Sequence, residues 1–527
     1  MPLTMQSYTK YMVLPIKFAN FAVIMRQQIS TFYSRHPLAL LLLLLAVTLL
    51  LSGAFADYAT KGEPREALVA IEMLRSSNWI LPVDGAGDIA YKPPLFHWII
   101  ALVSLPFGGV SEFTSRVPSM LGMLLMCAMT WKFVRGSKEP KKALLAFLIT
   151  ATSFEVFRAG VNCRVDMLLA ALMASAMMLM YRGGARNYLL ATLCMSGAVL
   201  TKGPVGVALP VFLWWLWRPT CKGKTFWTDT ALALLMTLGS LLLPALWYIA
   251  AWHEGGDTFL RLALEENFGR MTGTMSYASH VNPWYYNLLM LLCGLLPWTL
   301  LLVLSLAKRP WRFISKQGKG ISTRQLFCWI AVVGILIFYT IPKSKRGVYL
   351  LPLYPFAALL IADYILWYSS RIARVTRGMI ISGFTFMGLY LITYAVVWPI
   401  ITNKRSDRHV AHEVERLTGD APIYTFINSR MDRFYGVDFY LGTRMHSTLP
   451  SGQDERYRGV SYTPAMMRIP SDSCFYLVCT LTDVEEQGEA LSRHLSAAGV
   501  TLTQVWQSPR KTRDMHRPLV LFKAIRK

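Results

Sequence analysis

The sequence lacks the cysteine patterns and motifs that mark many metal-binding and enzyme classes. Its eight cysteines include no C-x-x-C pair, and six of them lie in or beside apolar segments. The part after residue 400 contains neither a Walker A nor a G-x-S-x-G motif. His409, His412 and Glu413 stand at helical spacing but do not form H-E-x-x-H, so we do not interpret them as metal ligands. A disulfide framework, a P-loop and a serine-hydrolase elbow are therefore not indicated.

Acidic residues are scarce, because 30 Asp and Glu oppose 54 Lys and Arg, which gives a net charge of +24. Most of the imbalance lies in the first 400 residues, since residues 401–527 contain 18 basic and 14 acidic residues. Basic cytoplasmic loops of a membrane protein, together with anionic lipid or phosphate ligands, would account for this distribution. Nucleic-acid binding is not expected.

Hydrophobic residues make up 54% of the chain, and the mean hydropathy is +0.38. Residues 37–56 run for 20 positions without a charge, which is enough for a helix to cross about 30 Å of hydrocarbon. Similar segments recur to about residue 398. The A-F-A at 54–56 resembles a signal-peptidase site, but the long segment before it and the many later spans favour an uncleaved anchor. These features predict a polytopic membrane protein.

Five basic clusters orient the predicted spans, because Lys and Arg are enriched in cytoplasmic loops. With residues 1–36 in the cytoplasm, all five clusters fall on that side. They are 131–142, 181–186, 218–224, 307–324 and 371–377. We expect a transmembrane helical bundle of about 11–13 spans within residues 37–400. Eleven spans can be given bounds: 37–56, 117–134, 140–157, 166–181, 187–201, 204–217, 229–251, 284–306, 324–341, 347–368 and 376–398.

The first loop, residues 57–116, is expected to lie on the periplasmic side. Its apolar segment 95–109 has 15 residues with proline near both ends, which favours a surface or re-entrant helix over a span. Residues 62–77 before it predict an amphipathic helix that lies on the membrane. The apolar side of that helix is formed by Leu68, Ile71 and Leu74.

After residue 400 the apolar runs shorten and alternate with amphipathic segments, which is typical of a small α/β domain. Residues 401–527 are expected to form such a domain in the periplasm. The expected strands are APIYTFI, CFYLVCTLT, VTLTQVW and PLVLFKAI. The expected helices are HVAHEVERL and VEEQGEALSRHLSAAG.

A set of charged residues lies at the outer ends of the predicted spans. Positive-inside sorting should deplete basic residues there, so an anionic substrate would explain them. The alternative is that they are interfacial side chains that snorkel to the membrane surface. The set comprises Glu63, Arg65, Glu66, Lys92, Arg158, Arg164, Asp166, Lys202, Glu265, Glu266, Arg270, Lys343, Lys345 and Arg346.

Two basic motifs in this set suit a phosphate. Lys202 precedes a Gly-Pro turn between two apolar segments. Three further cations, Lys343, Lys345 and Arg346, stand within four positions before a predicted span. Cations held there would neutralise the phosphate of a lipid carrier at the membrane surface.

Glu63 and Asp166 are the acids that fit a general base beside a phosphate site. A simpler role is open for both. Thr60 and Glu63 match the T-x-x-E capping box, and a carboxylate in a first turn suits the helix dipole. Asp166 begins the apolar segment 166–181, where its role could be capping alone.

A set of short segments within about residues 37–370 carries a resemblance to a known family. In order, they are EPREALVAIEMLRSSNWILP, YKPPLFHW, SEFTSRVPSML, RVDMLLA, TKGPVGVALP, FLRLALEENFGRMTG, NPWYY, LLPW and KSKRGVYLLPLYP. The set resembles the polyprenyl-phosphate-sugar-dependent glycosyltransferases of the GT-C superfamily, specifically the ArnT-like and protein O-mannosyltransferase-like families 39 and 83.

The resemblance implies an inverting transfer of a sugar from a lipid phosphate to an acceptor outside the membrane. In such enzymes an acid of the first external loop acts as base or orients the acceptor, while Lys and Arg hold the carrier phosphate. The family usually has Asp-Glu where this chain has Gly62-Glu63. Either Glu63, Asp57 or Asp166 supplies the acid, or the chemistry differs, and we prefer Glu63. The positions that match the family are Arg65, Lys92, Asp166, Lys202, Arg270 and Lys345.

We therefore expect a bacterial inner-membrane glycosyltransferase with its active site on the periplasmic face. It would use an undecaprenyl-phosphate sugar and modify lipid A, another envelope glycan or a protein. A lipid-linked-sugar flippase without catalysis is the alternative, although the paired polar halves expected of a transporter are not visible. No cofactor is expected to be required, and the sequence gives no support for a metal.

The expected site residues fall into two groups. The expected catalytic acids are Glu63 and Asp166. The expected ligands of the carrier phosphate and sugar are Arg65, Lys92, Lys202, Arg270, Lys343, Lys345 and Arg346.

Overall fold

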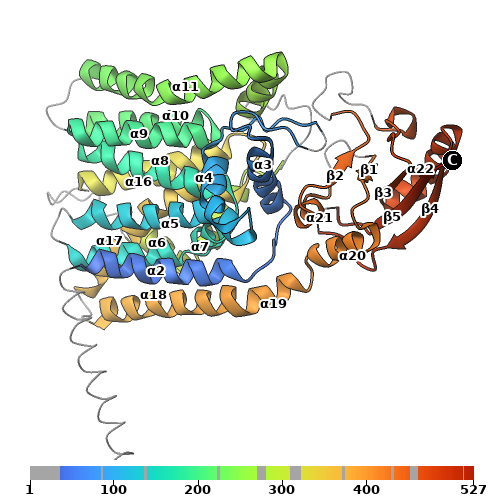
Figure 1. The fold of residues 1–527 in the computed structure, drawn as a ribbon. Coiled ribbons are helices and arrows are strands. Elements are labelled where there is room, and N and C mark those ends of the chain that lie inside the picture. The colour runs from blue at the N-terminus through green and yellow to red at the C-terminus, as the bar shows by residue number, and fades with distance from the viewer. Residues whose placement is uncertain are drawn as a thin grey trace, which may run out of the picture. The chain divides into compact units, whose positions relative to one another are not determined.

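The computed structural model describes residues 36–84, 87–135, 139–221, 226–269, 281–308, 322–370, 374–428, 433–451, 461–513 and 515–527 (Figure 1). Helices dominate this part of the chain, and a small sheet lies near the C-terminus. The α-helices up to residue 403 are α2 (Pro37–Ala54), α3 (Gly62–Ser76), α4 (Leu95–Ser104), α5 (Glu112–Arg135), α6 (Pro140–Thr152), α7 (Phe154–Gly160), α8 (Val165–Arg182), α9 (Ala185–Lys202), α10 (Val205–Trp217), α11 (Phe226–Leu264), α13 (Tyr286–Gly294), α14 (Thr299–Lys308), α16 (Thr323–Thr340), α17 (Tyr354–Ser369), α18 (Arg374–Ile392) and α19 (Trp398–Asn403). Short 3₁₀ and π turns are η1 (Leu105–Phe107), η2 (Arg218–Thr220), η3 (Glu265–Gly269), η4 (Gly347–Leu353) and η5 (Thr393–Val397).

Helices or bent helix pairs stand at each of the eleven positions where the sequence predicts a span. Within the described ranges, seven helices are long and apolar enough to cross a membrane, or nine if each of two bent pairs is one span. This number is below the expected 11–13, because α9 and α10 are too short or not apolar enough to qualify. The chain is a mainly α, multi-pass membrane protein, and the predicted fold class is confirmed.

Helix α8 packs between α5 and α9 and is largely buried in the bundle (Figure 1). The approach to α5 is close because Gly122 has no side chain. A Cβ at Gly122 would lie 3.0 Å from the Cα of Leu168. Small residues allow such close packing in lipid, where helices gain little from hydrophobic burial against one another. The first turn of α8, which carries Asp166, is therefore held firmly.

Two spans are broken, and their breaks meet. The α6–α7 pair bends by 66° and the α13–α14 pair by 114°. The Phe154 N–H at the first break donates a hydrogen bond to the Leu296 carbonyl at the second, at 3.0 Å. Irregular backbone at membrane depth is tolerated where protein or a polar cavity surrounds it. These breaks are consequently a natural place for a binding site.

In the first loop, residues 95–104 form α4, a ten-residue helix that is too short to span a bilayer, as expected. The predicted amphipathic helix is α3, but its apolar side packs against protein. Leu68 belongs to a buried cluster with Phe96 of α4 and Phe439, and Ile71 and Leu74 pack against that cluster. The expectation that this side faces lipid is wrong, because the C-terminal region supplies an apolar partner.

The C-terminal α/β region (residues 408–526) has a five-stranded sheet with the order β2-β1-β3-β5-β4. Strand β1 runs parallel to β2 and β3, while β5 is antiparallel to β3 and β4. All four predicted strands and both predicted helices are present. Strand β2 and helix α21 were not predicted, because they are short and show little hydrophobic periodicity. The elements are α20 (Arg408–Thr418), β1 (Ile423–Thr425), α21 (Tyr435–Tyr440), β2 (Met445–Ser447), η7 (Pro464–Met466), β3 (Cys474–Thr480), α22 (Leu481–Ala497), β4 (Val500–Gln507) and β5 (Leu519–Arg526).

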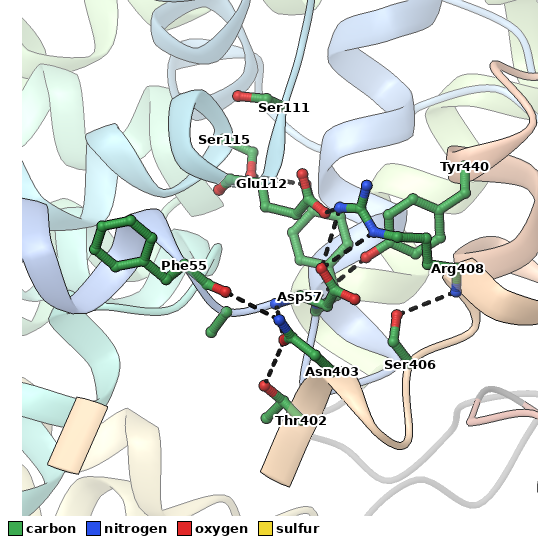
Figure 2. A network of polar contacts seen from close by, with 12 residues as sticks. Phe55, Asp57, Ser111, Glu112, Ser115, Thr402, Asn403, Ser406, Arg408 and Tyr440 are labelled. Carbon is green, nitrogen blue, oxygen red and sulfur yellow. Dashed lines mark hydrogen bonds and ion pairs between the residues drawn. The ribbon is translucent and has the colours of Figure 1, made fainter. Parts of the chain in front are cut away.

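The α/β region is attached to the start of the first loop by a polar network around Arg408 (Figure 2). The Arg408 guanidinium donates to the Asp57 carboxylate at 3.1 and 3.2 Å and also pairs with Glu112 at the start of α5. It lies over the ring of Tyr440, 4.6 Å from the centroid. Tyr58 meets the ring of Phe439 edge-on at 4.8 Å. The loop that leads into α3 is thus held between α5 and the α/β region.

Candidate functional site

A cavity of about 510 Å³ opens where the two broken spans meet the first turn of α8. Its walls come from α7, the start of α8, α13 and the start of η4. Six of the lining side chains are charged. The lining residues are Thr60, Phe154, Glu155, Arg158, Ala159, Asn162, Arg164, Asp166, Tyr286, Met290, Cys293, Gly294, Lys345, Arg346, Gly347 and Val348.

Both carboxylates in the lining are paired with a cation. Asp166 forms an ion pair with Lys202, whose ammonium also lies 4.2 Å from the centre of the Tyr349 ring. Glu155 accepts two hydrogen bonds from Arg158, one turn further along α7, at 2.9 and 2.5 Å. Each pair is neutral as a unit. The charge that a ligand would meet is therefore set by the remaining cations.

Three further cations line the cavity. Lys345 is buried and donates to the backbone carbonyl of Asn282 at 3.1 Å. The guanidiniums of Arg164 and Arg346 make no hydrogen bond or salt bridge among the residues that the structure describes, although both attract the nearby Asp166 carboxylate. Three positive charges are thus left without a paired acid. Such a cavity favours an anion, and guanidinium groups are well suited to phosphate oxygens.

Glu63 is fully buried and is absent from the cavity lining. One of its oxygens accepts from Arg116 Nε and the Cys163 N–H, both at 3.2 Å. The other accepts from the backbone N–H groups of Ala59 at 2.9 Å and Thr60 at 3.2 Å. The bond from the Thr60 N–H is one half of the predicted capping box. The other half is absent, because Lys61 is the N-cap residue and the Glu63 N–H bonds to the Thr60 carbonyl and not to its hydroxyl. Asp166 behaves differently, since its carboxylate pairs with Lys202 and reaches the cavity.

Arg65 and Lys92 belong to a second cluster, which is centred on Glu66. The Glu66 carboxylate accepts from Lys92 at 2.7 Å, from His97 Nε2 at 2.9 Å and from Arg65 at 3.3 Å. Burial alone would raise the pKa of Glu66, but Lys92, the His97 hydrogen bond and Arg65 outweigh it and hold that pKa well below its usual range. Burial and the nearby Arg65 lower the pKa of Lys92 to about 8, against the opposing effect of Glu66.

The structure thus divides the predicted site residues. Asp166, Lys345 and Arg346 line the cavity, and Lys202 reaches it through Asp166. Lys343 is exposed and is not part of the lining. Arg270 lies outside the described residues. The two residues left, Arg65 and Lys92, lie in the Glu66 cluster.

Sequence reasoning assigned no role to three of the charged lining residues. Arg158 and Arg164 stood in the set of outer charges but received no role. Glu155 was not noticed, although an acid and an arginine three positions apart in an apolar stretch are a detectable signal. Across the described ranges, no group of three or more His, Cys, Asp or Glu side chains is arranged to hold a metal ion.

The chain is similar to known lipid-carrier glycosyltransferases. A family model described as dolichyl-phosphate-mannose-protein mannosyltransferase matches residues 91–248. The undecaprenyl phosphate-alpha-4-amino-4-deoxy-L-arabinose arabinosyl transferase of Edwardsiella ictaluri is 30% identical over 312 residues, which cover 58% of this chain and 54% of that protein. The protein of the same name from Erwinia tasmaniensis is 28% identical, with 57% and 54% covered. The chain therefore spans about half the length of the curated relatives it matches.

Two solved structures share the architecture. ArnT from Cupriavidus metallidurans, bound to undecaprenyl phosphate, matches with a TM-score of 0.71 and 17% identity, covering 92% of this chain and 97% of that one. The archaeal oligosaccharyltransferase AglB from Archaeoglobus fulgidus, in complex with an inhibitory peptide and a dolichol-phosphate, matches with a TM-score of 0.52 and 11% identity, covering 91% and 74%. At these identities the likeness concerns the fold alone. The chain has the fold of the GT-C superfamily and is similar in sequence to its ArnT-like glycosyltransferases.

Proposed function

We propose that this protein is an inverting glycosyltransferase of the bacterial inner membrane, with its active site on the periplasmic face. It transfers a sugar from an undecaprenyl-phosphate carrier to lipid A, another envelope glycan or a protein. The observation that carries this proposal is the cavity at the two helix breaks, in which three cations without a paired acid stand beside a buried carboxylate. The relatives named as undecaprenyl phosphate-alpha-4-amino-4-deoxy-L-arabinose arabinosyl transferases support the donor class.

The cations of the cavity stabilise the leaving group. As the bond between the anomeric carbon and the phosphate oxygen breaks, the electron pair goes to the phosphate, which gains a negative charge. Arg346 and Lys345 offset that charge in a site of limited solvent access. The fixed position of these groups makes the stabilisation available without reorganisation at the moment of reaction.

Asp166 is the acid that we assign as general base. It takes the proton of the acceptor hydroxyl as that oxygen bonds to the anomeric carbon from the face opposite the phosphate. The incoming phosphate competes for the Lys202 ammonium, which leaves the Asp166 carboxylate available for the proton. Glu63, the acid preferred from the sequence, instead holds the loop that leads to Arg65 against α5 through Arg116.

A transfer assay with the purified full chain tests the proposal. The donor is an undecaprenyl-phosphate sugar with a radiolabelled sugar, and lipid A or an envelope extract is the acceptor. Asp166→Asn is compared with the matched control Asp229→Asn, because Asp229 is an equally buried acid that pairs with Arg218 away from the cavity. We expect Asp166→Asn to lose transfer by at least 100-fold, on the order of a general-base contribution, and the control to retain it.

Equal transfer by both variants would refute the assignment of Asp166. The flippase alternative is tested in vesicles with the same labelled lipid. Movement of intact lipid across the bilayer, with no cleavage of the sugar-phosphate bond by the wild type, would favour transport over catalysis.

A further inference from the structure

Gly62 is the first residue of α3, and a neighbouring side chain occupies the space that a side chain at this position would need. It is not among the glycines with positive φ, so its backbone conformation is open to any residue. The space beside its α carbon is filled by the guanidinium of Arg164. A Cβ built on Gly62 would overlap Arg164 Nη1 and would lie 2.7 Å from Cζ.

The backbone of Arg164 is fixed by hydrogen bonds, whereas its guanidinium attracts Asp166 only from a distance and makes no hydrogen bond or salt bridge with the residues that the structure describes. Ser119 of α5 donates from Oγ to the Arg164 carbonyl at 3.1 Å, and the Arg164 N–H donates to the same Oγ at 3.4 Å. The side chain extends over Gly62 and lines the cavity. Among the described residues nothing accepts a hydrogen bond from it. The nearby acid, Asp166, is engaged with Lys202.

We propose that Gly62 and Arg164 together form an anion subsite of the cavity. The absent side chain at position 62 leaves room for the guanidinium, which donates two parallel N–H groups to a phosphate oxyanion. Position 62 thereby determines whether the cavity offers this cation. The inference rests on the proposed function only for the identity of the ligand, which is a phosphate-bearing lipid.

The phosphate can come from two sources. One is the carrier, whose phosphate would then meet Arg164 in addition to Arg346 and Lys345. The other is a phosphorylated acceptor such as lipid A. The chemistry of recognition is the same, so the experiment measures each source separately.

Substitution at Gly62 tests the subsite without removing a charged residue. The atoms that a new side chain would meet are the flexible end of Arg164, so the fold can accommodate it at little cost. Gly62→Ala displaces the guanidinium, and Gly62→Asp also neutralises it. Gly388→Ala is the control, because Gly388 is a helical glycine of α18 with no atom near its missing Cβ.

Binding of undecaprenyl phosphate to the detergent-purified chain is measured by tryptophan fluorescence, with undecaprenol as the uncharged probe. We expect Gly62→Ala and Arg164→Ala each to lower the affinity for undecaprenyl phosphate about tenfold. Gly62→Asp should lower that affinity at least as much. A variant that combines Gly62→Ala with Arg164→Ala should bind undecaprenyl phosphate no more weakly than Arg164→Ala alone, because both changes remove the same guanidinium. Undecaprenol binding and thermal midpoints should match those of Gly388→Ala.

If carrier binding is unchanged but the KM for lipid A rises tenfold in both single variants, the subsite stands and the anion belongs to the acceptor. Unchanged carrier binding together with unchanged KM for lipid A would overturn the subsite while leaving the proposed transfer intact. Arg164-dependent carrier binding by a wild type that transfers no sugar would support the subsite and refute the proposed function instead.

Discussion

The substitution Glu63→Gln tests whether Glu63 is structural, fixing the loop before α3 through Arg116, or catalytic, as the sequence suggested. Both carboxylate oxygens of Glu63 accept hydrogen bonds from fixed N–H donors, and Arg116 is 3% exposed. A Gln amide supplies one acceptor oxygen, while its NH₂ group must face a donor that already occupies the other position. The substitution also leaves the buried Arg116 guanidinium without its counter-ion.

The magnitude follows from these contacts. Arg116 keeps hydrogen bonds to the carbonyls of Gly53, Ala56 and Asp57, at 3.0, 2.6 and 3.2 Å, so its desolvation is only partly uncompensated. We expect Glu63→Gln to cost about 1 to 3 kcal/mol of local stability. Glu63→Ala removes every acceptor and should cost about 3 to 5 kcal/mol, the range for breaking a buried ion pair.

The loss of stability is measured by thermal unfolding in detergent, monitored by tryptophan fluorescence. Sugar transfer is normalised to the folded fraction. Arg116→Gln and the double variant complete a cycle, in which the two costs should not add because the residues share one ion pair. A Glu63→Gln protein that melts like the wild type but transfers no sugar would refute the holding role. It would return Glu63 to the chemistry.

Two further predictions concern pH. If Lys92 binds the carrier phosphate, the affinity for undecaprenyl phosphate should fall as pH rises through about 8, where Lys92 loses its proton. Lys92→Arg should flatten this pH dependence. A wild-type affinity that does not change with pH would exclude Lys92 from the phosphate site. Burial raises the pKa of Asp438 to about 7 although the Met445 N–H opposes it, so folding of the α/β region loses stability as pH rises from about 4 to 7. Asp438→Asn should therefore stabilise this region at pH 8 more than at pH 5, by about 2 to 3 kcal/mol, and raise its thermal midpoint accordingly. Equal midpoint changes at both pH values would contradict the burial argument.

The positions of the membrane helices could be predicted because lipid leaves few alternatives. A long uncharged segment such as 37–56 has to satisfy its backbone within itself, so it forms a helix. The breaks at Thr152–Phe154 and Gly294–Thr299 were not predicted, because each apolar run continues across the bend. The partner of α3 was also hidden, since periodicity identifies an apolar side but not whether lipid or protein covers it.

The site was harder to predict, because its members come from segments distant in sequence. The resemblance leads one to expect an acid at position 62, yet in space the glycine there makes room for Arg164, 102 residues later in the chain. Nothing in the local sequence indicates this, because the distance between the two positions is set by packing of α3, α5 and α8. Charge and topology alone pointed to the segment of Lys343, Lys345 and Arg346, but not to which of these side chains line the cavity, since Lys343 does not.

Capping and catalysis draw on the same residue types, and the accessibility of the partner cation separates them. Glu63 and Asp166 are both buried acids near a helix start, each paired with one cation. The cation of Glu63 is 3% exposed and is also bound to three carbonyls, whereas Lys202 beside Asp166 is 25% exposed. A ligand phosphate can compete for Lys202 but has no access to Arg116. If a carboxylate accepts a proton more readily once its counter-ion can be drawn away, this difference favours Asp166 over Glu63 as the proposed base.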